Sequence, residues 1–203
     1  MKASQAATST LAYLWAATVY TVLSVMVLGL LYPLVMTPVA QLLFPRQAGG
    51  SMMYLNGQPI ASDIIGQLWT KPQYFHGRPS AAGNNGYDPT STGGTNLAPT
   101  SKKLIDSTRS AIAELIKDNP QGWGALPMDL VTSSASGIDP DITPEAADYQ
   151  APRIAQARHL ALEAVRSLIA QHVHGRQLGI FGEPHVNVLE LNLALDGKTA
   201  QQR

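Results

Sequence analysis

Residues 11–31 read LAYLWAATVYTVLSVMVLGLL, and this apolar run determines how the rest of the chain is interpreted. No charged side chain occurs between Lys2 and Arg46. An α-helix of about 21 residues rises roughly 31 Å, at about 1.5 Å per residue, and the hydrocarbon core of a bilayer is about 30 Å thick. We therefore predict a transmembrane helix over residues 11–34, preceded by a short tail over residues 1–10.

The polar and aromatic side chains of this segment also suit a bilayer. Thr18, Thr21 and Ser24 can donate their hydroxyls to carbonyls of the same helix, which costs little in lipid. Trp15 lies near one end of the run and Tyr32 lies just beyond the other, where interfacial aromatic residues occur. The segment is therefore typical of a membrane anchor.

A cleaved signal peptide is the alternative interpretation of the same segment. Its apolar region should span about 7–15 residues and end at small residues. The run here is longer, and Pro38-Val39-Ala40 is a poor cleavage site, so a retained anchor is favoured. Charge says little about orientation, because Lys2 lies on one side and Arg46 on the other. A first uncleaved span before a large domain usually keeps its tail inside, so we expect a cytoplasmic N-terminus and an extracytoplasmic domain.

Composition excludes several classes of function. The chain has 203 residues, with 14 Lys and Arg against 14 Asp and Glu, so it lacks the basic excess of a nucleic-acid-binding protein. Hydrophobic residues make up 45% of the chain, which is enough to build a core. Cysteine is absent, which rules out disulfides, thiolate metal sites, a cysteine nucleophile and a lipidated cysteine.

The residues after the span predict an α+β domain. Pro33, Pro38 and Pro45 should end or kink the membrane helix and form a stalk over residues 35–50. An extracytoplasmic domain then follows over residues 51–198. It is expected to hold a short sheet and two or more amphipathic helices, with a tail over residues 199–203.

Turn and cap signals place the elements of this domain. Asn56-Gly57 between apolar runs predicts a β-hairpin, and the glycine- and proline-rich residues 71–100 predict a long loop. The segment 64–68 is expected to continue the sheet or begin a helix, and 186–195 is buried as either a strand or a helix. The remaining expectations are an amphipathic helix over 101–118, a buried strand over 126–131, a helix beginning at Thr143-Pro144, and its break at Pro152 before a second helix over 153–174.

The hydroxyl-rich loop over residues 132–139 is the main candidate for binding chemistry. Hydroxyls and a glycine that lead into a helix can hold an anion with backbone N–H groups, although ordinary capping explains the same composition better. The candidate residues are Ser133, Ser134, Ser136, Gly137 and Asp139.

Histidines give weaker signals. His76 and Arg78 suit a phosphate, but packing of the loop is the favoured reading. His172, His174 and His185 offer a possible zinc site, but a solvated helix end explains them better. No G-x-S-x-G, H-E-x-x-H or other nucleophile–base arrangement occurs, so we expect neither a catalytic residue nor a metal site.

Long irregular motifs carry a resemblance to a known family. From the anchor almost to the C-terminus, the chain resembles the C subunits (KdpC) of Kdp-type potassium-transporting ATPases. The motifs are IGQ at 65–67, YFHGRPS at 74–80, GGTNLAPT at 93–100, LVTSSASGIDP at 130–140 and GEPHVNVLELN at 182–192.

The resemblance implies a subunit of a bacterial inner-membrane complex. Its partners would be a channel-like potassium-binding subunit, a P-type ATPase subunit and a small single-span peptide, besides membrane lipid. The family role is that of an assembly factor and catalytic chaperone said to raise the ATP affinity of the pump subunit. In that account the loop at residues 132–139 contacts nucleotide, although an external loop would meet little ATP. No cofactor is therefore assigned to this chain, and ATP is expected only through the pump subunit.

We interpret the chain as a non-catalytic accessory subunit. Small residues of the span permit close helix approach, and residues 74–79, here called the YFHG segment, concentrate aromatic and basic groups. A nucleotide-binding cofactor subunit and an anchored enzyme stay as alternatives. The residues expected to contact partner subunits are Ala16, Ala17, Ser24, Gly29, Tyr74, Phe75, His76 and Arg78.

Overall fold

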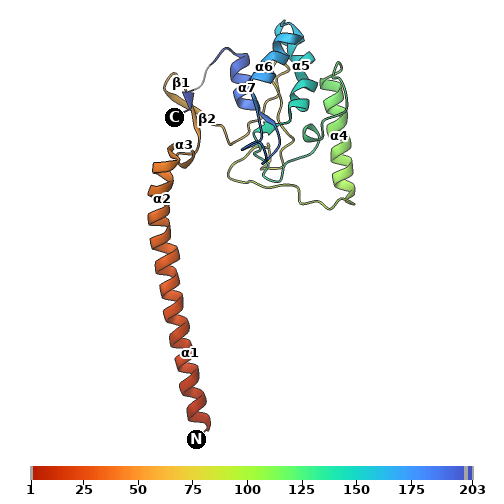
Figure 1. Ribbon diagram of the computed structural model, residues 1–203. Coiled ribbons are helices and arrows are strands. Elements are labelled where there is room, and N and C mark those ends of the chain that lie inside the picture. The colour runs from red at the N-terminus through yellow and green to blue at the C-terminus, as the bar shows by residue number, and fades with distance from the viewer. Residues whose placement is uncertain (1, 199–200, 203) are drawn as a thin grey trace. The chain divides into compact units, whose positions relative to one another are not determined.

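The protein divides into two compact units, Met1–Gly50 and Ser51–Arg203. The structure is a computed structural model that describes residues 2–198 and 201–202 (Figure 1). The first unit is helical, and the second combines helices with two small sheets. The predicted α+β class, with one long apolar helix before it, is confirmed.

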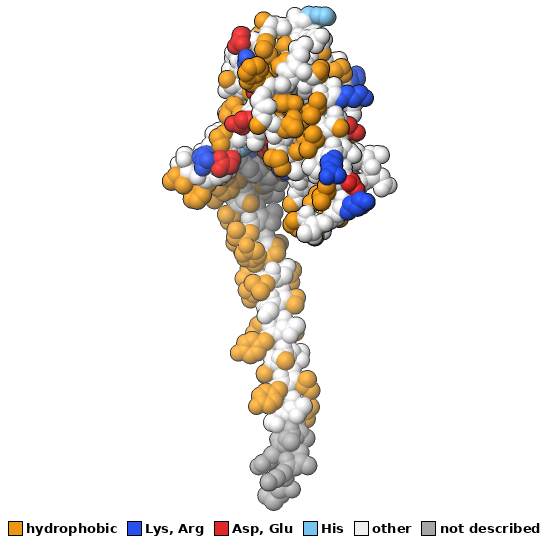
Figure 2. Space-filling view, turned by 90° about the vertical axis from the view of Figure 1, so that its right-hand side faces the viewer, with side chains coloured by type: hydrophobic (Ala, Val, Ile, Leu, Met, Phe, Trp, Pro, Cys, Tyr) orange, Lys and Arg blue, Asp and Glu red, His pale blue; other side chains and the backbone are white. Residues whose placement is uncertain are grey.

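The first unit is dominated by one apolar helix. Its segment Ser9–Leu43 has a mean hydropathy of 2.1 and is long and apolar enough to cross a membrane. The face turned toward the viewer in Figure 2 carries only hydrophobic and uncharged side chains in its described part. The hydroxyls of Thr18 and Thr21 donate to the carbonyls of Leu14 and Ala17, each at 2.8 Å, as the sequence predicts. The elements are α1 (Lys2–Ser24), η1 (Val25–Leu31), α2 (Tyr32–Leu43) and α3 (Pro45–Ala48).

Pro33 and Pro38 were expected to end or kink the membrane helix, and neither of them ends it. The element η1 is a π-helix, and the N–H of Tyr32 donates to the carbonyl of Val27, five residues earlier. A proline ring clashes with the carbonyl four residues before it in an α-helix, which for Pro33 is that of Gly29. The wider π turn changes the register just there, so the helix continues to Leu43. Most of the segment expected as a stalk is therefore helical.

A β-hairpin opens the second unit, as the sequence predicts. Strands β1 (Met52–Leu55) and β2 (Gln58–Ser62) pair antiparallel. Asn56 and Gly57 have φ of 52° and 77°, and two left-handed residues form the tight turn that matches strand twist. Strand β6 (Gln201–Gln202) pairs with β1, so the sheet order is β2-β1-β6.

The second sheet lies among the main helices of the domain. Its order is β3-β5-β4, formed by β3 (Asp141–Ile142), β4 (Val173–His174) and β5 (His185–Asn187). The ambiguous segment 186–195 is both strand and helix, because β5 passes directly into α7 (Val188–Leu195) at the capping side chain of Asn187.

Two helices form where Thr143 and the residues after it predict them, but their boundary differs. Thr143 caps α5 (Pro144–Arg158) by accepting a hydrogen bond from Ala146 N at 3.1 Å. This helix runs through Pro152 and ends at His159, whose φ is 55°. The predicted break at Pro152 is therefore wrong. The second helix is α6 (Leu162–Gln171), shorter than predicted because β4 follows it.

The remaining elements correct two further expectations. The amphipathic helix α4 (Lys102–Asp118) is confirmed, whereas residues 126–131 form the short 3₁₀ helix η2 (Met128–Leu130) instead of a strand. Residues 64–68 are neither strand nor helix. The core is rich in alanine and includes Phe75, Ile142, Ala146, Ala147, Ala151, Ile154, Val165, Val186 and Leu191.

Candidate functional site

Two buried amides hold the YFHG segment against the helices. Asn192 of α7 accepts a hydrogen bond from Phe75 N at 2.8 Å and donates to Phe75 O at 3.0 Å. Gln150 of α5 likewise accepts a hydrogen bond from His76 N at 2.8 Å and donates to His76 O at 3.1 Å. Both amides are only 1% exposed. These side chains thus satisfy backbone groups that a neighbouring strand would otherwise pair.

Arg153 extends this arrangement from the same helix α5. It is 9% exposed, and its guanidinium donates to the carbonyls of Pro72 and Tyr74, the latter at 3.0 Å. It also donates to Asn119 Oδ1 at 2.9 Å and to Gln150 Oε1 at 2.8 Å. Burial lowers the pKa of Arg153 to about 10. One side chain therefore joins the loop, the end of α4 and α5.

Tyr74 is held at the other end of the segment. Its hydroxyl donates to Asp196 Oδ2 at 3.0 Å, and the Arg158 guanidinium donates to Asp196 Oδ1 at 2.7 Å. The same guanidinium lies 4.9 Å from the centre of the Tyr74 ring. Burial acts to raise the pKa of Asp196, but hydrogen bonds from Arg158, Tyr74 and Lys198 outweigh it and hold the pKa below its usual value.

Arg78 and Asp139 connect the YFHG segment to the serine-rich loop. Arg78 Nη1 lies 3.0 Å from Asp139 Oδ2. Tyr87 donates its hydroxyl to the carbonyl of Arg78 at 2.5 Å, and burial raises the pKa of Tyr87 to about 12, with Asp139 adding to the effect. The Asp139 side chain also accepts from Asp141 N at 3.1 Å. Asp139 thus stabilises the local turn and the ion pair together.

The serines of the candidate loop bond mainly to the loop itself. Ser134 Oγ accepts from Gly137 N at 2.8 Å, and Ser136 Oγ accepts from Ile138 N at 3.3 Å. Ser134 is 7% exposed, and Ser133 is half-buried. The donors at residues 137 and 138 are therefore already engaged. The loop is followed by β3 before α5 begins, so it does not lead directly into a helix N-terminus as an anion cradle requires.

Gly137 is required by the close approach of two other loops. Its φ is +71°, and a Cβ there would lie 2.7 Å from both Gly93 O and Ala82 Cβ. Gly93 N donates to Ser136 O at 2.9 Å, and Ser80 Oγ donates to Gly137 O. Residues 80–93 and 132–139 are thus packed backbone to backbone.

The residues predicted to contact partners fall into three groups. Phe75 is 0% exposed, so its ring belongs to the core, and the expectation of a direct partner contact is wrong for it. Tyr74, His76 and Arg78 are half-buried and bonded within the domain, and their contact with a partner stays a prediction. In the span, Ser24 and Gly29 line a shallow hollow on the helix surface with Tyr20, Thr21, Val25 and Leu28, while Ala16 and Ala17 lie about two turns earlier.

The histidines do not gather into one cluster. The rings of His174 and His185 stack with their centroids 5.4 Å apart, and His174 Nε2 lies 3.1 Å from Glu190 Oε2. His172 instead has its Nδ1 2.8 Å from Leu168 O. Among residues 2–198 and 201–202, no group of three or more His, Asp or Glu side chains is placed to hold a metal ion.

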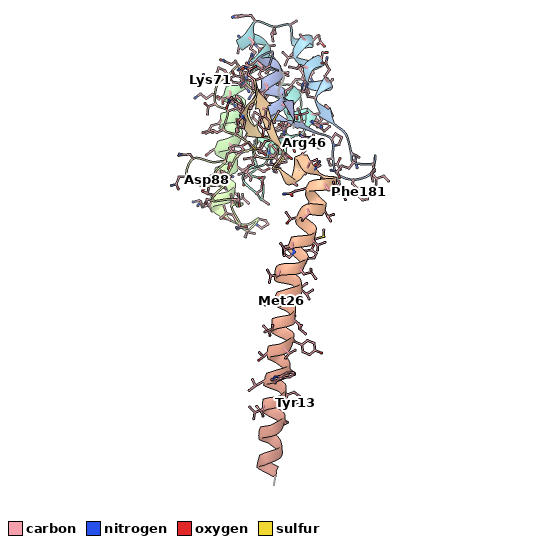
Figure 3. The ribbon with its side chains drawn as sticks, turned by 90° about the vertical axis from the view of Figure 1, so that its left-hand side faces the viewer. Tyr13, Met26, Arg46, Lys71, Asp88 and Phe181 are labelled. Carbon is pink, nitrogen blue, oxygen red and sulfur yellow. The ribbon has the colours of Figure 1, made fainter. Side chains whose placement is uncertain are left out.

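A cavity of about 460 Å³ with both polar and apolar lining residues lies between the YFHG segment and α4. Its lining includes His76, Arg78, Asn84, Glu114 and Asp118. Burial, followed by the charge of Arg153, lowers the pKa of His76 below its ordinary value, although Lys71 O and Asp118 act in the opposite direction. Figure 3 labels Lys71, which precedes the YFHG segment, and Asp88, which follows the loop residues 83–87 of the cavity lining.

Sequence reasoning missed the polar residues that hold these loops. Gln150, Arg153 and Asn192 lie on helices and bond to residues about 30 to more than 100 positions away. The sequence offers only a local indication of their importance. Asn192 interrupts the apolar run 188–195, and Gln150 and Arg153 interrupt the alanine-rich face of α5. A polar residue on a buried helical face has to find a partner, but sequence spacing does not identify it.

Comparison with known proteins shows which family shares the sequence of this chain. A sequence model of the KdpC family, described as the K+-transporting ATPase c chain, matches residues 14–197. The chain belongs to the KdpC family. A potassium-transporting ATPase KdpC subunit of Acidobacterium capsulatum is 57% identical over 91% of this chain and 97% of the relative. Those of Koribacter versatilis and Bradyrhizobium diazoefficiens are 49% and 50% identical, over 87% and 85% of this chain and 90% of each relative.

The motifs that resemble the KdpC family lie side by side in the fold. Gly66 N donates to Ile138 O at 2.8 Å, and Val188 N donates to Pro140 O at 3.0 Å. With the bonds from Gly93 to Ser136 and from Phe75 to Asn192, every one of the five motifs reaches another. The KdpC motifs therefore form one connected scaffold.

Proposed function

We propose that this chain is a non-catalytic accessory subunit that assembles and stabilises a potassium-transporting ATPase complex. The observation that carries the proposal is how the motifs use their polar groups. Serine hydroxyls, amides and the Arg78–Asp139 pair bond to one another or to backbone. Such an arrangement supports a rigid docking body better than a reaction centre, which needs a nucleophile and a base converging on substrate.

The apolar helix supplies the membrane part of this role. We propose that it spans the inner membrane once, with a cytoplasmic N-terminus and the domain on the extracytoplasmic side. Its hollow at Ser24 and Gly29 permits the close approach of a partner helix, as small residues do in membranes. The proposed partners are the channel-like subunit, the P-type ATPase subunit and the small single-span peptide.

Any effect on ATP is proposed to act through the assembled complex. A domain outside the membrane meets little ATP, and the donors of residues 137 and 138 are engaged by Ser134 and Ser136. A catalytic-chaperone effect on the pump subunit would then follow from stabilising that subunit in one conformation. Direct nucleotide binding by this chain is the competing function.

Co-purification of the full chain with its partner subunits tests the assembly role. Ser24→Leu together with Gly29→Leu fills the hollow and should lower the recovery of the partners. Val22→Phe also adds bulk to the helix, but on the opposite side, about 200° from Ser24, and should not lower the recovery. Undiminished stoichiometric recovery with a variant lacking residues 11–31 would show that the span is not the main contact.

Two measurements separate this proposal from direct nucleotide binding. Protease accessibility in right-side-out and inverted inner-membrane vesicles reports the side of the domain. Equilibrium binding of ATP to the full chain should show no saturation. Saturable binding that is lost in Ser136→Ala, whose side chain is exposed, would replace the proposal with a nucleotide-binding role.

A further inference from the structure

The hairpin between β4 and β5 ends in a tight apolar turn. Gln177 and Phe181 form its last bridge, with N–H to O=C distances of 2.8 and 2.9 Å. Leu178 and Gly179 turn the chain with φ of 54° and 74°. Leu178, Ile180 and Phe181, here called the apolar tip, are 88%, 71% and 62% exposed. Figure 3 shows Phe181 on a segment that extends from the body of the domain.

The apolar tip is unusual among the surfaces of the domain. Three large apolar side chains in four residues face outward, one of them on a left-handed residue where a leucine is strained. The nearest charges, Arg176 and Glu183, pair with each other at 2.5 Å across the base of the hairpin. The tip therefore presents apolar area with no unbalanced charge.

The base of this hairpin is joined to the point where the domain meets its anchor. Asn187 at the end of β5 donates to Asp63 O at 2.7 Å, and Asp63 N donates to Ser51 O at 3.1 Å. Ser51 is the first residue of the domain unit. Phe181 lies six residues before Asn187, so the tip is at most about 20 Å from Asn187 at roughly 3.3 Å per residue.

The connection to the apolar helix is also short. The helix ends at Leu43, and residues 44–50, part of which form α3, lead to Ser51. Seven residues span at most about 25 Å even when extended. Covalent geometry therefore limits how far the apolar tip can lie from the surface of any membrane that the helix crosses.

We propose that the apolar tip inserts into the interfacial region of the bilayer that holds the apolar helix. A bilayer requires no shape complementarity, whereas a stable protein interface buries about 800 Å² on each partner, far more than three side chains on a convex turn present. The tether keeps the tip close to lipid, so even a weak insertion is populated. The inference needs the helix in a membrane but depends on neither the partner subunits nor the sidedness of the domain.

Fluorescence of a labelled single cysteine tests the insertion in the full-length protein. The chain has no cysteine, so Ile180→Cys carries one nitrobenzoxadiazole probe without further changes. The protein is reconstituted into vesicles of phosphatidylethanolamine and phosphatidylglycerol with and without doxyl-labelled lipid. The matched control is Trp123→Cys, because Trp123 is another apolar side chain of the domain and is 83% exposed.

Insertion predicts blue-shifted emission and quenching by doxyl lipid several-fold stronger at residue 180 than at residue 123. Phe181→Cys provides a second labelled site if the first variant folds poorly, and it should give the same result. Equal, weak quenching at both positions and the control would overturn the inference. A blue shift that appears only on assembly with the partner subunits, without lipid quenching, would also overturn it and assign the tip to a protein interface.

Discussion

The two units of the chain use apolar residues in opposite ways. In Met1–Gly50 the large apolar side chains of the span are exposed, and helix α2 has no buried residue. In Ser51–Arg203 the core buries large side chains such as Phe75 and Ile154 together with several alanines. The stability of the first unit therefore depends on the medium around its apolar side chains, whereas the stability of the second depends on specific contacts within it.

Polar groups sharpen this contrast. The apolar helix satisfies its backbone internally, so in a membrane any apolar residue would serve at most positions. The domain has a loop of about forty residues without regular structure, and Gln150, Arg153 and Asn192 satisfy backbone groups of its segment 72–76. Apolar composition therefore determines the structure of the first unit, whereas a small number of polar side chains determine how the loop of the second unit folds.

Removing Arg153 should produce the largest effect. Arg153→Met keeps much of the volume but leaves the carbonyls of Pro72 and Tyr74 and the side chain of Asn119 without their donor. Each buried acceptor that is left without its donor costs about 1–3 kcal/mol, so several such losses at once give a large effect. Urea unfolding of the full-length protein in detergent, followed by near-ultraviolet circular dichroism of the domain, measures this change.

Arg109→Met is the matched control for that exchange. The Arg109 side chain is 77% exposed, and its contact with Asp106 is 3.9 Å long. An exposed pair of this kind contributes about 0–1 kcal/mol. If both variants unfold at the same urea concentration, buried polar groups do not hold the domain together.

The contrast also explains which parts of the fold could be predicted from the sequence. The long apolar helix, the Asn56-Gly57 hairpin and the start of α5 at Thr143 depend on neighbouring residues, and all three are confirmed, while the crossing of a membrane by that helix stays a prediction. Residues 126–131 were predicted as a strand because they are apolar, but no partner strand is available to them. Pro152 was predicted to break a helix that tertiary packing of Ala151 and Ile154 maintains.

The candidate site was predicted only in outline. The sequence identified the loop at 132–139 and the segment 74–80 as special, and both belong to the connected scaffold. It did not indicate that Ser134 and Ser136 serve their own loop, because that depends on the backbone conformation at Gly137. It also could not assign Phe75 to the core, because its burial depends on helices far along the chain.

A charge in the span should give the next largest effect. Leu23→Arg places a cation in the apolar helix, and insertion scales assign about 2.5–3.5 kcal/mol to such a residue at the centre of a span. The fraction of protein that resists alkaline extraction from membranes should fall. Leu23→Ile should leave it unchanged, since apolar residues are interchangeable there. Unchanged extraction of the arginine variant would argue against a membrane-spanning helix.

Gly137→Ala should destabilise the domain by a smaller amount. The new Cβ would meet Gly93 O at 2.7 Å in a left-handed backbone, and strained positions of this kind cost about 1–3 kcal/mol. Gly93→Ala is the control within the same pair of loops, because a Cβ there meets nothing within 4 Å. Thermal unfolding of both variants measures the difference. Equal midpoints would show that the two loops separate readily.

The pH dependence of stability should reveal the smallest effect, at His76. Burial and the charge of Arg153 lower the pKa of His76, so the unfolded chain binds a proton at a higher pH than the native domain does. The free energy of unfolding should therefore fall as the pH drops from about 7.5 through the ordinary histidine pKa of about 6.5. His76→Gln removes this contribution and can still donate to Lys71 O, which lies 3.1 Å from the ring.

Comparing the pH dependence of unfolding between His76→Gln and the parent separates the contribution of the histidine from that of the carboxylates. Burial raises the pKa of Asp141, which gives an opposing trend at lower pH, but this group is present in both proteins and cancels in the comparison. Urea unfolding at several pH values between about 5 and 8 should show a flatter profile for His76→Gln than for the parent. Parallel profiles would mean that the loop opens to solvent around His76. Contacts inside the domain would then not be what keeps this segment buried.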